Sequence, residues 1–202
     1  MREDLPKDSK RLDELIELAR RLGVTDAAII SAESISIEDD LANLCRDSRC
    51  ENYGLSASCP PHVAGPSGFR ELLKHFKQAL VFKIDVPTDI LFSDERSELF
   101  KLLHEIAASI EQSAVEAGFP NSKGYAGGSC KMIFCRNQPD CRVVEERGEC
   151  RNPRSARPSM SGFGINVSKL MEAAGWKLSV AKREGDKDKA KIGTLCGLVL
   201  VG

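Results

Sequence analysis

Apolar side chains recur every three or four positions in four stretches, which cover residues 9–22, 66–76, 93–117 and 164–174. A repeat of this length places the apolar side chains along one face of an α-helix. Gly118 follows the longest stretch, and glycine is frequent just beyond the end of a helix. The pattern therefore predicts four amphipathic helices, of which 93–117 is the longest.

Shorter apolar or alternating runs predict the strands. A turn at residues 31–34 would join the first two in a hairpin, and the charged residues 182–190 would join the last two. The final run is apolar on both faces, so we expect it at the centre of the sheet. The predicted strands cover residues 24–30, 34–40, 79–86, 176–181 and 191–202.

Helices and strands do not alternate strictly, and predicted hairpins occur near both ends of the chain. This order is typical of an α+β fold, with a layer of mainly antiparallel sheet and helices packed on it. We expect residues 1–202 to form a single domain. Two cysteine-rich loops, at about 45–62 and 127–160, would project from one end of the sheet.

The composition limits the partners and the compartment. A formal net charge of -1 gives no reason to expect nucleic acid or a membrane surface as partner. The first ten residues lack the apolar core of a secretory signal, and the longest apolar run is too short to span a bilayer. We therefore expect a cytoplasmic protein, where clustered cysteines are more often metal ligands or redox groups than disulfides.

Seven of the eight cysteines lie in the two loops. Neither loop contains the C-x2-C knuckle that is usual in zinc sites, and the longer spacings suit a larger group such as an iron–sulfur cluster. Four thiolates can complete one [4Fe-4S] cluster, whereas three leave one iron open. The first loop holds Cys45, Cys50 and Cys59, and the second holds Cys130, Cys135, Cys141 and Cys150.

The eighth cysteine, Cys196, is an alternative fourth ligand for the first loop. It lies in the apolar run GTLCGLVLVG, where a cysteine is more often a small buried core residue. We therefore expect Cys196 in the core.

Arginines surround the second loop, and two of them, Arg154 and Arg157, are candidate cofactor-binding residues. Cations near a thiolate cluster stabilise its negative charge, and guanidinium groups also bind anionic substrates. A solvated loop arginine is the simpler alternative for either residue.

Histidines and tyrosines give weaker candidates. His62 follows Cys-Pro-Pro and could be a nitrogen ligand, a proton donor or a hydrogen-bonded loop residue. Tyr125 precedes the second cysteine group and could contact the cofactor or pack in the core. His75 and His104 lie beside the apolar stripes of predicted helices, so we expect both to face solvent.

Two motifs carry a resemblance to a known family. The first is C-R-x-x-R-C-x-x-Y-G-L-S-x-S-C-P-P-H from Cys45 to His62, and the second is G-G-S-C at 127–130 followed by C-R-x-P-x-x-A-R-P-S-M from Cys150. Together they resemble the DUF2284 family of predicted metal-binding proteins. The resemblance implies a cysteine-bound metal centre, with an iron–sulfur centre expected, in a protein of an anaerobic bacterium or archaeon. The family pattern has C-x2-C pairs after G-G-S-C, so the resemblance supports Cys130 and Cys150 more directly than the cysteines between them.

Three functions are consistent with these features. The first is an iron–sulfur protein with one or two [4Fe-4S] clusters, which acts in redox chemistry or electron transfer with a partner protein or a small anionic substrate. The second is a zinc-binding structural or regulatory module that binds another protein. The third, a metal-free thiol redox enzyme or sensor, is disfavoured because no C-x-x-C pair is present. Catalysis and simple electron transfer are both open.

Overall fold

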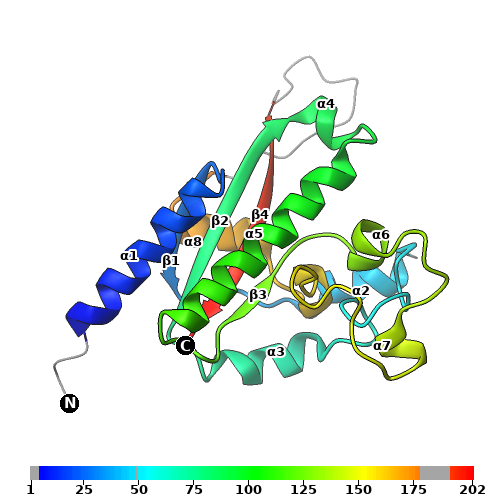
Figure 1. The fold of residues 1–202 in the computed structure, drawn as a ribbon, viewed down its shortest axis with the longest axis horizontal. Helices are drawn as coiled ribbons and strands as arrows, with labels where there is room; N and C mark the ends of the chain where they lie inside the picture. The colour runs from blue at the N-terminus through cyan, green and yellow to red at the C-terminus, as the bar shows by residue number, and fades with distance from the viewer. Residues whose placement is uncertain (1–4, 49, 178–191) are drawn as a thin grey trace.

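The structure is a computed structural model, which describes residues 5–48, 50–177 and 192–202. Its sheet has four strands in the order β1-β2-β4-β3, and every neighbouring pair is antiparallel (Figure 1). The longest pairing, between β2 and β4, runs from Gln78 opposite Val201 to Pro87 opposite Ile192. The strands are β1 (Asp26–Ser31), β2 (Gln78–Pro87), β3 (Lys123–Tyr125) and β4 (Ile192–Val201).

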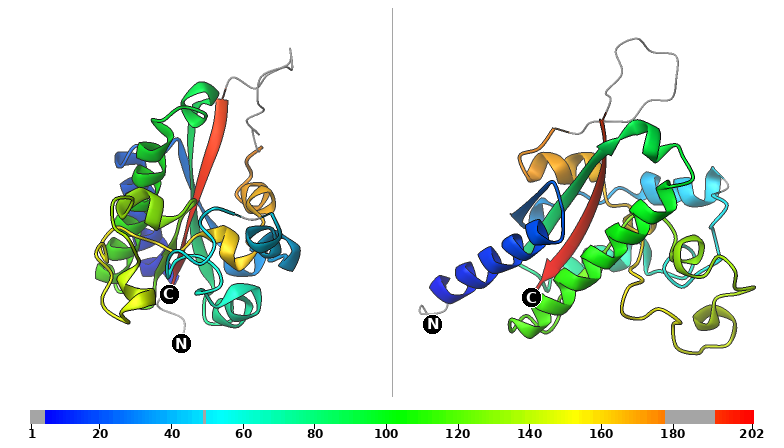
Figure 2. Two further views of the ribbon diagram at one scale, coloured as in Figure 1. Left: turned by 90° about the vertical axis from the view of Figure 1, so that its right-hand side faces the viewer. Right: turned by 45° about the horizontal axis from the view of Figure 1, so that its top comes forward.

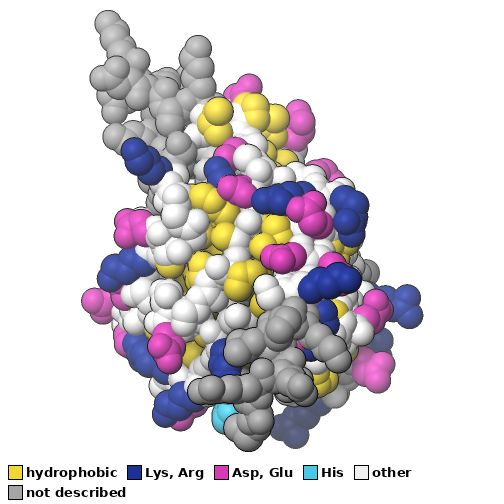
Figure 3. Space-filling view, turned by 90° about the vertical axis from the view of Figure 1, so that its left-hand side faces the viewer, with side chains coloured by type: hydrophobic (Ala, Val, Ile, Leu, Met, Phe, Trp, Pro, Cys, Tyr) yellow, Lys and Arg dark blue, Asp and Glu magenta, His cyan; other side chains and the backbone are white. Residues whose placement is uncertain are grey.

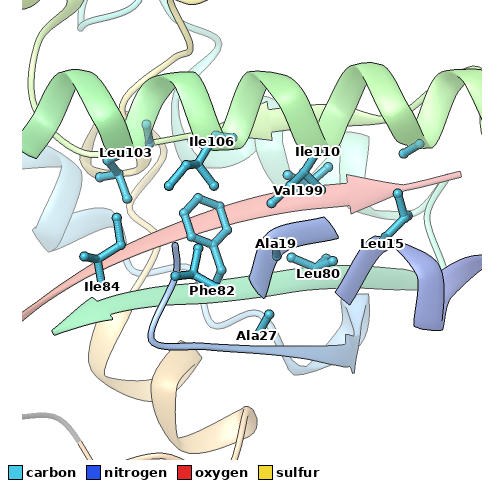
Figure 4. Close-up of a cluster of buried hydrophobic side chains, with 14 of the residues drawn as sticks. Leu15, Ala19, Ala27, Leu80, Phe82, Ile84, Leu103, Ile106, Ile110 and Val199 are labelled. Carbon is cyan, nitrogen blue, oxygen red and sulfur yellow. The ribbon is translucent and has the colours of Figure 1, made fainter. Parts of the chain in front are cut away.

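Helices α1 (Leu5–Arg21) and α5 (Arg96–Glu116) cover one face of the sheet (Figure 1). Both present their predicted apolar stripes to it, and Figure 4 shows Leu103, Ile106 and Ile110 of α5 above Phe82 and Val199. Burial of such side chains is worth about 1.5–3 kcal/mol each. This burial therefore fixes α5 on the sheet, beside the cysteine segments.

The other face of the sheet is covered by α3 (Gly65–Leu73), α8 (Val167–Ala173) and the 3-10 helix η2 (Met160–Phe163) (Figure 2). Four of the helices predicted from apolar periodicity are thus present, with ends shifted by a few residues. The antiparallel sheet between two helical layers confirms the α+β fold.

Strand β4 lies between β2 and β3, which confirms the expected central place of the last apolar run. Its side chains alternate between the two cores. Val199 faces α1 and α5, whereas Cys196, Leu198 and Leu200 belong to the core on the other face. Cys196 is therefore a buried residue of this second core, away from the other cysteines in the sequence.

Gly197 of β4 lies against the fully buried ring of Phe82, its partner residue on β2. A Cβ atom at this position would overlap the ring. We expect Gly197→Ala to lower the free energy of unfolding by about 1–3 kcal/mol, the usual cost of overpacking a core. Urea unfolding measures this cost. Gly148→Ala is the matched control, because an added Cβ there meets its nearest atom at 3.7 Å; an equal loss in both variants would contradict the packing argument.

The predicted N-terminal hairpin is wrong. After β1 the chain forms a 3-10 turn, η1 (Ala32–Ser34), which the Ser31 side chain caps by accepting from Glu33 N. Of the residues 34–40, only Ile37 forms a β-bridge, to Ile165, and Asp39 and Asp40 begin a helix. Acidic residues favour a helix start, and this preference outweighs the short alternation of Ile35 and Ile37.

The cysteine segments also differ from the expected loops, because short helices form within both. Helix α2 (Asp39–Asp47) contains Cys45, α6 (Cys130–Phe134) begins at Cys130, and α7 (Arg142–Glu145) follows Cys141. A further short helix, α4 (Thr88–Leu91), joins β2 to α5. The labels α2, α6 and α7 lie on the same side of the molecule in Figure 1.

The predicted strand at 176–181 and the loop at 182–190 lie almost wholly outside the described residues; Trp176 and Lys177 are described and have no regular structure. Figure 3 views the molecule from the side of α1 and β1, where apolar side chains lie between charged ones. No helix in the described part of the chain is long and apolar enough to cross a membrane.

Candidate metal centre

The four cysteines of the second segment line one cavity. Cys130 begins α6, Cys135 follows its end, Cys141 precedes α7, and Cys150 lies in the irregular chain beyond it. The two short helices fold the segment back on itself, and Lys131 stabilises this turn by donating to the backbone oxygens of Cys135 and Gln138. Cysteines spread over 21 positions of the sequence, 130 to 150, are thus brought to a common site.

Asn152 connects two of these sulfurs. Its side-chain Nδ2 donates to Cys135 Sγ at 3.3 Å, and its backbone N–H donates to Cys150 Sγ at 3.3 Å. Hydrogen bonds from N–H groups stabilise the thiolate form of a cysteine and raise the potential of an iron–sulfur cluster that it holds. The sequence motif contains Asn152 only as a variable position, so sequence reasoning missed it.

Cys130 joins the two cysteine segments. Ser58, one residue before Cys59, lies with its Oγ 2.8 Å from Cys130 Sγ. Burial raises the pKa of Cys130, hydrogen bonds from Ser58 and Ser56 oppose this rise, and the nearby Cys59 and Cys150 add to it. Cys130 is therefore a neighbour of both sets of thiols.

In the first segment, Cys50 and Cys59 each lie close enough to Cys45 to affect its pKa. Burial raises the pKa of Cys45, and the proximity of Cys50 and then Cys59 raises it further. Cys59 is buried, Cys45 is half-buried and Cys50 is exposed. Neighbouring thiols resist ionisation together, so a bound cation that replaces their protons relieves this repulsion.

Backbone bonds hold together the two chain ends that enter and leave the second segment. Ala126, just beyond β3, forms a parallel bridge with Ser159. Ala126 N donates to Pro158 O at 3.0 Å, and Met160 N donates to Ala126 O at 2.9 Å. Ser159 N also donates to Ser58 O at 3.1 Å, which ties the first segment to the same place. The two family motifs thus meet in space.

His104 of α5 is fully buried, so the prediction that it faces solvent is wrong. Its Nδ1 accepts from Arg157 N at 3.0 Å, and its Nε2 lies 2.9 Å from Gly127 O. The ring also meets Phe134 edge-on, with 5.6 Å between centroids. Because Nδ1 accepts, Nε2 must carry the proton, and desolvation lowers the pKa of His104 to about 4. The neutral ring therefore connects the chain before Cys130 to the chain after Cys150. His75, by contrast, is exposed as expected.

The structure does not place Arg154 and Arg157 in a common anion site. Arg157 is buried and pairs with Glu111 of α5 at 2.6 Å, and it also donates to the backbone oxygens of Pro153 and Ala156. Arg154 is exposed, and its backbone oxygen accepts from Gln112 Nε2. The donors of Arg157 are thus used to fix the chain after Cys150 on α5.

His62 lies close to a backbone oxygen of the first segment, whereas Tyr125 packs in the core. His62 is exposed, and its Nε2 lies 3.1 Å from Gly54 O within the first segment. Tyr125 is buried and meets Phe69 and Phe163 edge-on, with centroid distances of 5.1 and 5.3 Å. The contacts of Tyr125 are those of a core residue.

The charge of the cavity lining suits thiolates. Lys131, Arg142 and Arg151 line it beside the cysteines, and the described lining includes no Asp, Glu or His. Arg142 and Arg151 each contact an acid outside the lining, Glu146 and Asp140. Four thiols with three cations around them fit a negatively charged thiolate–metal group.

The cavity is small, about 20 Å³, close to the room that one water needs. A group bound by all four sulfurs therefore fits only if the cavity widens around it. Among the described residues, no three His, Cys, Asp or Glu side chains are grouped so as to hold a single metal ion.

Comparison with known proteins identifies the family but no closer relative. Residues 28–201 match the family model described as "Predicted metal-binding protein (DUF2284)". No curated protein and no solved structure matches the chain. The matched range contains all eight cysteines and the whole of the site described above. The chain therefore belongs to the DUF2284 family of predicted metal-binding proteins.

Proposed function

We propose that the protein is an iron–sulfur protein that acts in redox chemistry or electron transfer. The observation that carries this proposal is the single cavity lined by Cys130, Cys135, Cys141 and Cys150, with cations beside them. These four thiolates would hold one [4Fe-4S] cluster. Iron–sulfur clusters take cysteine thiolates as ligands and supply one-electron chemistry.

The first segment would hold a second cluster or contribute to a shared one. Cys50 and Cys59 both lie near Cys45, and Ser58 contacts Cys130. Three thiolates leave one coordination position for another ligand, and this position is where a small substrate would bind. Buried Cys196 is not placed to fill it, because it packs in the core on β4.

The surrounding residues would hold and tune such a centre. Asn152 donates N–H bonds toward two of the sulfurs, and Lys131 fixes the turn between Cys130 and Cys135. The chain segments on either side are fixed to α5 through His104 and Arg157. Exchange of an electron with a partner protein needs an accessible edge of the centre, and Cys135, Cys141 and Cys150 are only half-buried.

The test is purification of the whole chain without oxygen, followed by its visible spectrum. We expect a brown protein with broad absorbance in the blue that a chemical reductant bleaches. A colourless protein that binds stoichiometric zinc and contains no acid-labile sulfide would instead make it a zinc module. A metal-free protein that forms a reversible disulfide on mild oxidation would make it a thiol redox protein.

Asn152→Ala is expected to weaken the binding of the metal centre. The variant loses the bond from Nδ2 to Cys135 but keeps the backbone bond to Cys150. Loss of such an outer hydrogen bond typically lowers metal affinity about 10–100-fold. Competition with a chelator, followed by colour or metal release, measures the change. Asn121→Ala, which removes a side chain outside the segment, is the control, and equal retention in both variants would contradict a role for the Asn152 side chain.

A further inference from the structure

A second cavity lies beside the metal centre, between the first cysteine segment, the start of α5 and α6. Its volume is about 290 Å³, near the lower end of the range of about 300–1,000 Å³ for small-molecule sites. We propose that this cavity binds a small organic acid or phosphate ester that also carries a hydrogen-bond donor.

Two buried polar atoms without partners belong to residues that line this cavity. Ser129 is 5 % exposed, and neither its Oγ nor Asn52 Oδ1 has a hydrogen-bond partner. In the described ranges only one other buried side-chain atom, Arg11 Nε, shares this state. A buried polar atom without a partner costs about 1–3 kcal/mol, so a molecule that these two side chains could turn toward would be stabilised by completing their bonding.

The missing hydrogen bond of Ser129 is unusual for its position in the chain. It is the N-cap of α6, where a serine side chain normally accepts a bond from the first turn of the helix. Here the side chain makes no such bond, and only the backbone oxygen of Ser129 accepts, from Met132 N and Ile133 N. The hydroxyl therefore has no partner within the described chain, and a rotation of this side chain would turn it toward a molecule in the cavity.

Two arginines on the cavity lining favour an oxyanion. Arg96 and Arg136 are both exposed, and neither forms an ion pair with any residue that the structure describes. Arg96 lies over the ring of Phe100, with Cζ 5.7 Å from its centroid, and it begins the 21-residue helix α5. A guanidinium group binds a carboxylate or phosphate through two parallel N–H bonds, and a helix N-terminus adds positive potential.

Two acids on the same lining set the second requirement. Glu51 and Asp94 also line the cavity, so their carboxylates oppose a ligand that carries only negative charge. A hydroxyl or ammonium group on the ligand would donate to them. An amino acid, a hydroxy acid or a hydroxylated phosphate ester meets both requirements, whereas a plain dicarboxylate meets only one.

The cavity adjoins both sets of cysteines. Ser129 directly precedes Cys130, and Asn52 follows Cys50 by two residues. A bound molecule would therefore lie beside the candidate cluster. Its role as a substrate of that centre rests on the proposed function, whereas its binding does not.

Titration calorimetry of the whole, metal-loaded protein tests the proposal with three probes, L-glutamate, L-malate and glycerol 3-phosphate. We expect at least one to bind, and the double variant Arg96→Gln with Arg136→Gln to weaken it at least about tenfold. Arg21→Gln, which changes an exposed arginine of α1, should leave the affinity unchanged. Ser129→Ala should weaken the same probe with both arginines intact.

Three results would overturn the proposal. The first is no binding of any probe up to about 10 mM, which corresponds to a binding free energy of only about 3 kcal/mol. The second is unchanged affinity in the double arginine variant. The third is succinate binding as tightly as L-malate, since succinate lacks the donor. Iron and sulfide analysis of the same samples separates the two proposals. If the protein contains zinc and binds a probe, only the proposed iron–sulfur function is wrong. If it contains iron and sulfide but binds no probe, only the proposed ligand site is wrong.

Discussion

Cys150→Ser is expected to lose the metal centre. Cys150 is half-buried, lines the cavity with the other three cysteines of its segment and accepts from Asn152 N. Serine keeps the size of the side chain but replaces the soft thiolate with a poor ligand for iron. Because changes around a metal site already cost about 10–100-fold in affinity, loss of a ligand itself should exceed 100-fold. Iron and sulfide content after anaerobic purification measures the loss.

Cys196→Ala is the matched control for this experiment. Cys196 is buried on β4, and burial raises its pKa to about 12, so it stays a protonated thiol. We expect this variant to keep its full metal content and to lose only about 1 kcal/mol of stability from a smaller core side chain. Retention of the metal by Cys150→Ser, or its loss from Cys196→Ala, would contradict the assignment of the site.

His104→Leu is expected to lower the free energy of unfolding by about 3 kcal/mol. Leucine fills much of the same space but leaves Gly127 O and Arg157 N without the bonds that the imidazole provides. Each buried backbone group left without a partner costs about 1–3 kcal/mol. Urea unfolding measures the difference. His104→Gln, whose amide has both a donor and an acceptor, should recover part of the loss.

The pH dependence of stability tests the buried, neutral state of His104 in a second way. Desolvation by burial is the main cause that lowers the pKa of His104 from 6.5 to about 4, and the nearby Arg157 contributes. The unfolded chain therefore binds a proton below about pH 6.5, whereas the folded protein does not do so until about pH 4. Stability should fall as the pH falls through this window, by about 2 kcal/mol between pH 7 and pH 5 from this residue alone.

Comparison of variants isolates the contribution of His104. The His104→Leu variant should lack this part of the pH dependence, while His75→Leu, which changes an exposed histidine, should keep it and retain its stability. If His104→Leu loses as much stability between pH 7 and pH 5 as the parent protein, the neutral buried state of His104 is wrong.

The fold could be predicted from the sequence where periodicity is long. The stripe of α5 and the two-sided apolar run of β4 define the core, and both lie where they were expected. The short alternation at 34–40 was misleading, because a few apolar residues fit a bridge and a helix start as well as a strand. Long patterns average over many side chains, whereas short ones depend on tertiary contacts.

Part of the candidate site could be predicted in the same way. The cysteine spacing indicated two groups of thiols, but no local pattern shows that Ser58 reaches Cys130 or that Asn152 reaches Cys135. The prediction for His104 was wrong because a histidine beside an apolar stripe can face either solvent or the core. Here the partners that satisfy its ring, Gly127 and Arg157, lie 23 and 53 positions away in the sequence.

The most direct test of the central claim is the iron, zinc and acid-labile sulfide content of the protein isolated without oxygen. The proposed function predicts iron and sulfide in a ratio near one, with about four of each for every [4Fe-4S] cluster and little zinc. An electron paramagnetic resonance spectrum of the reduced protein would then count the clusters. Stoichiometric zinc without sulfide would contradict the claim that these cysteines hold an iron–sulfur centre.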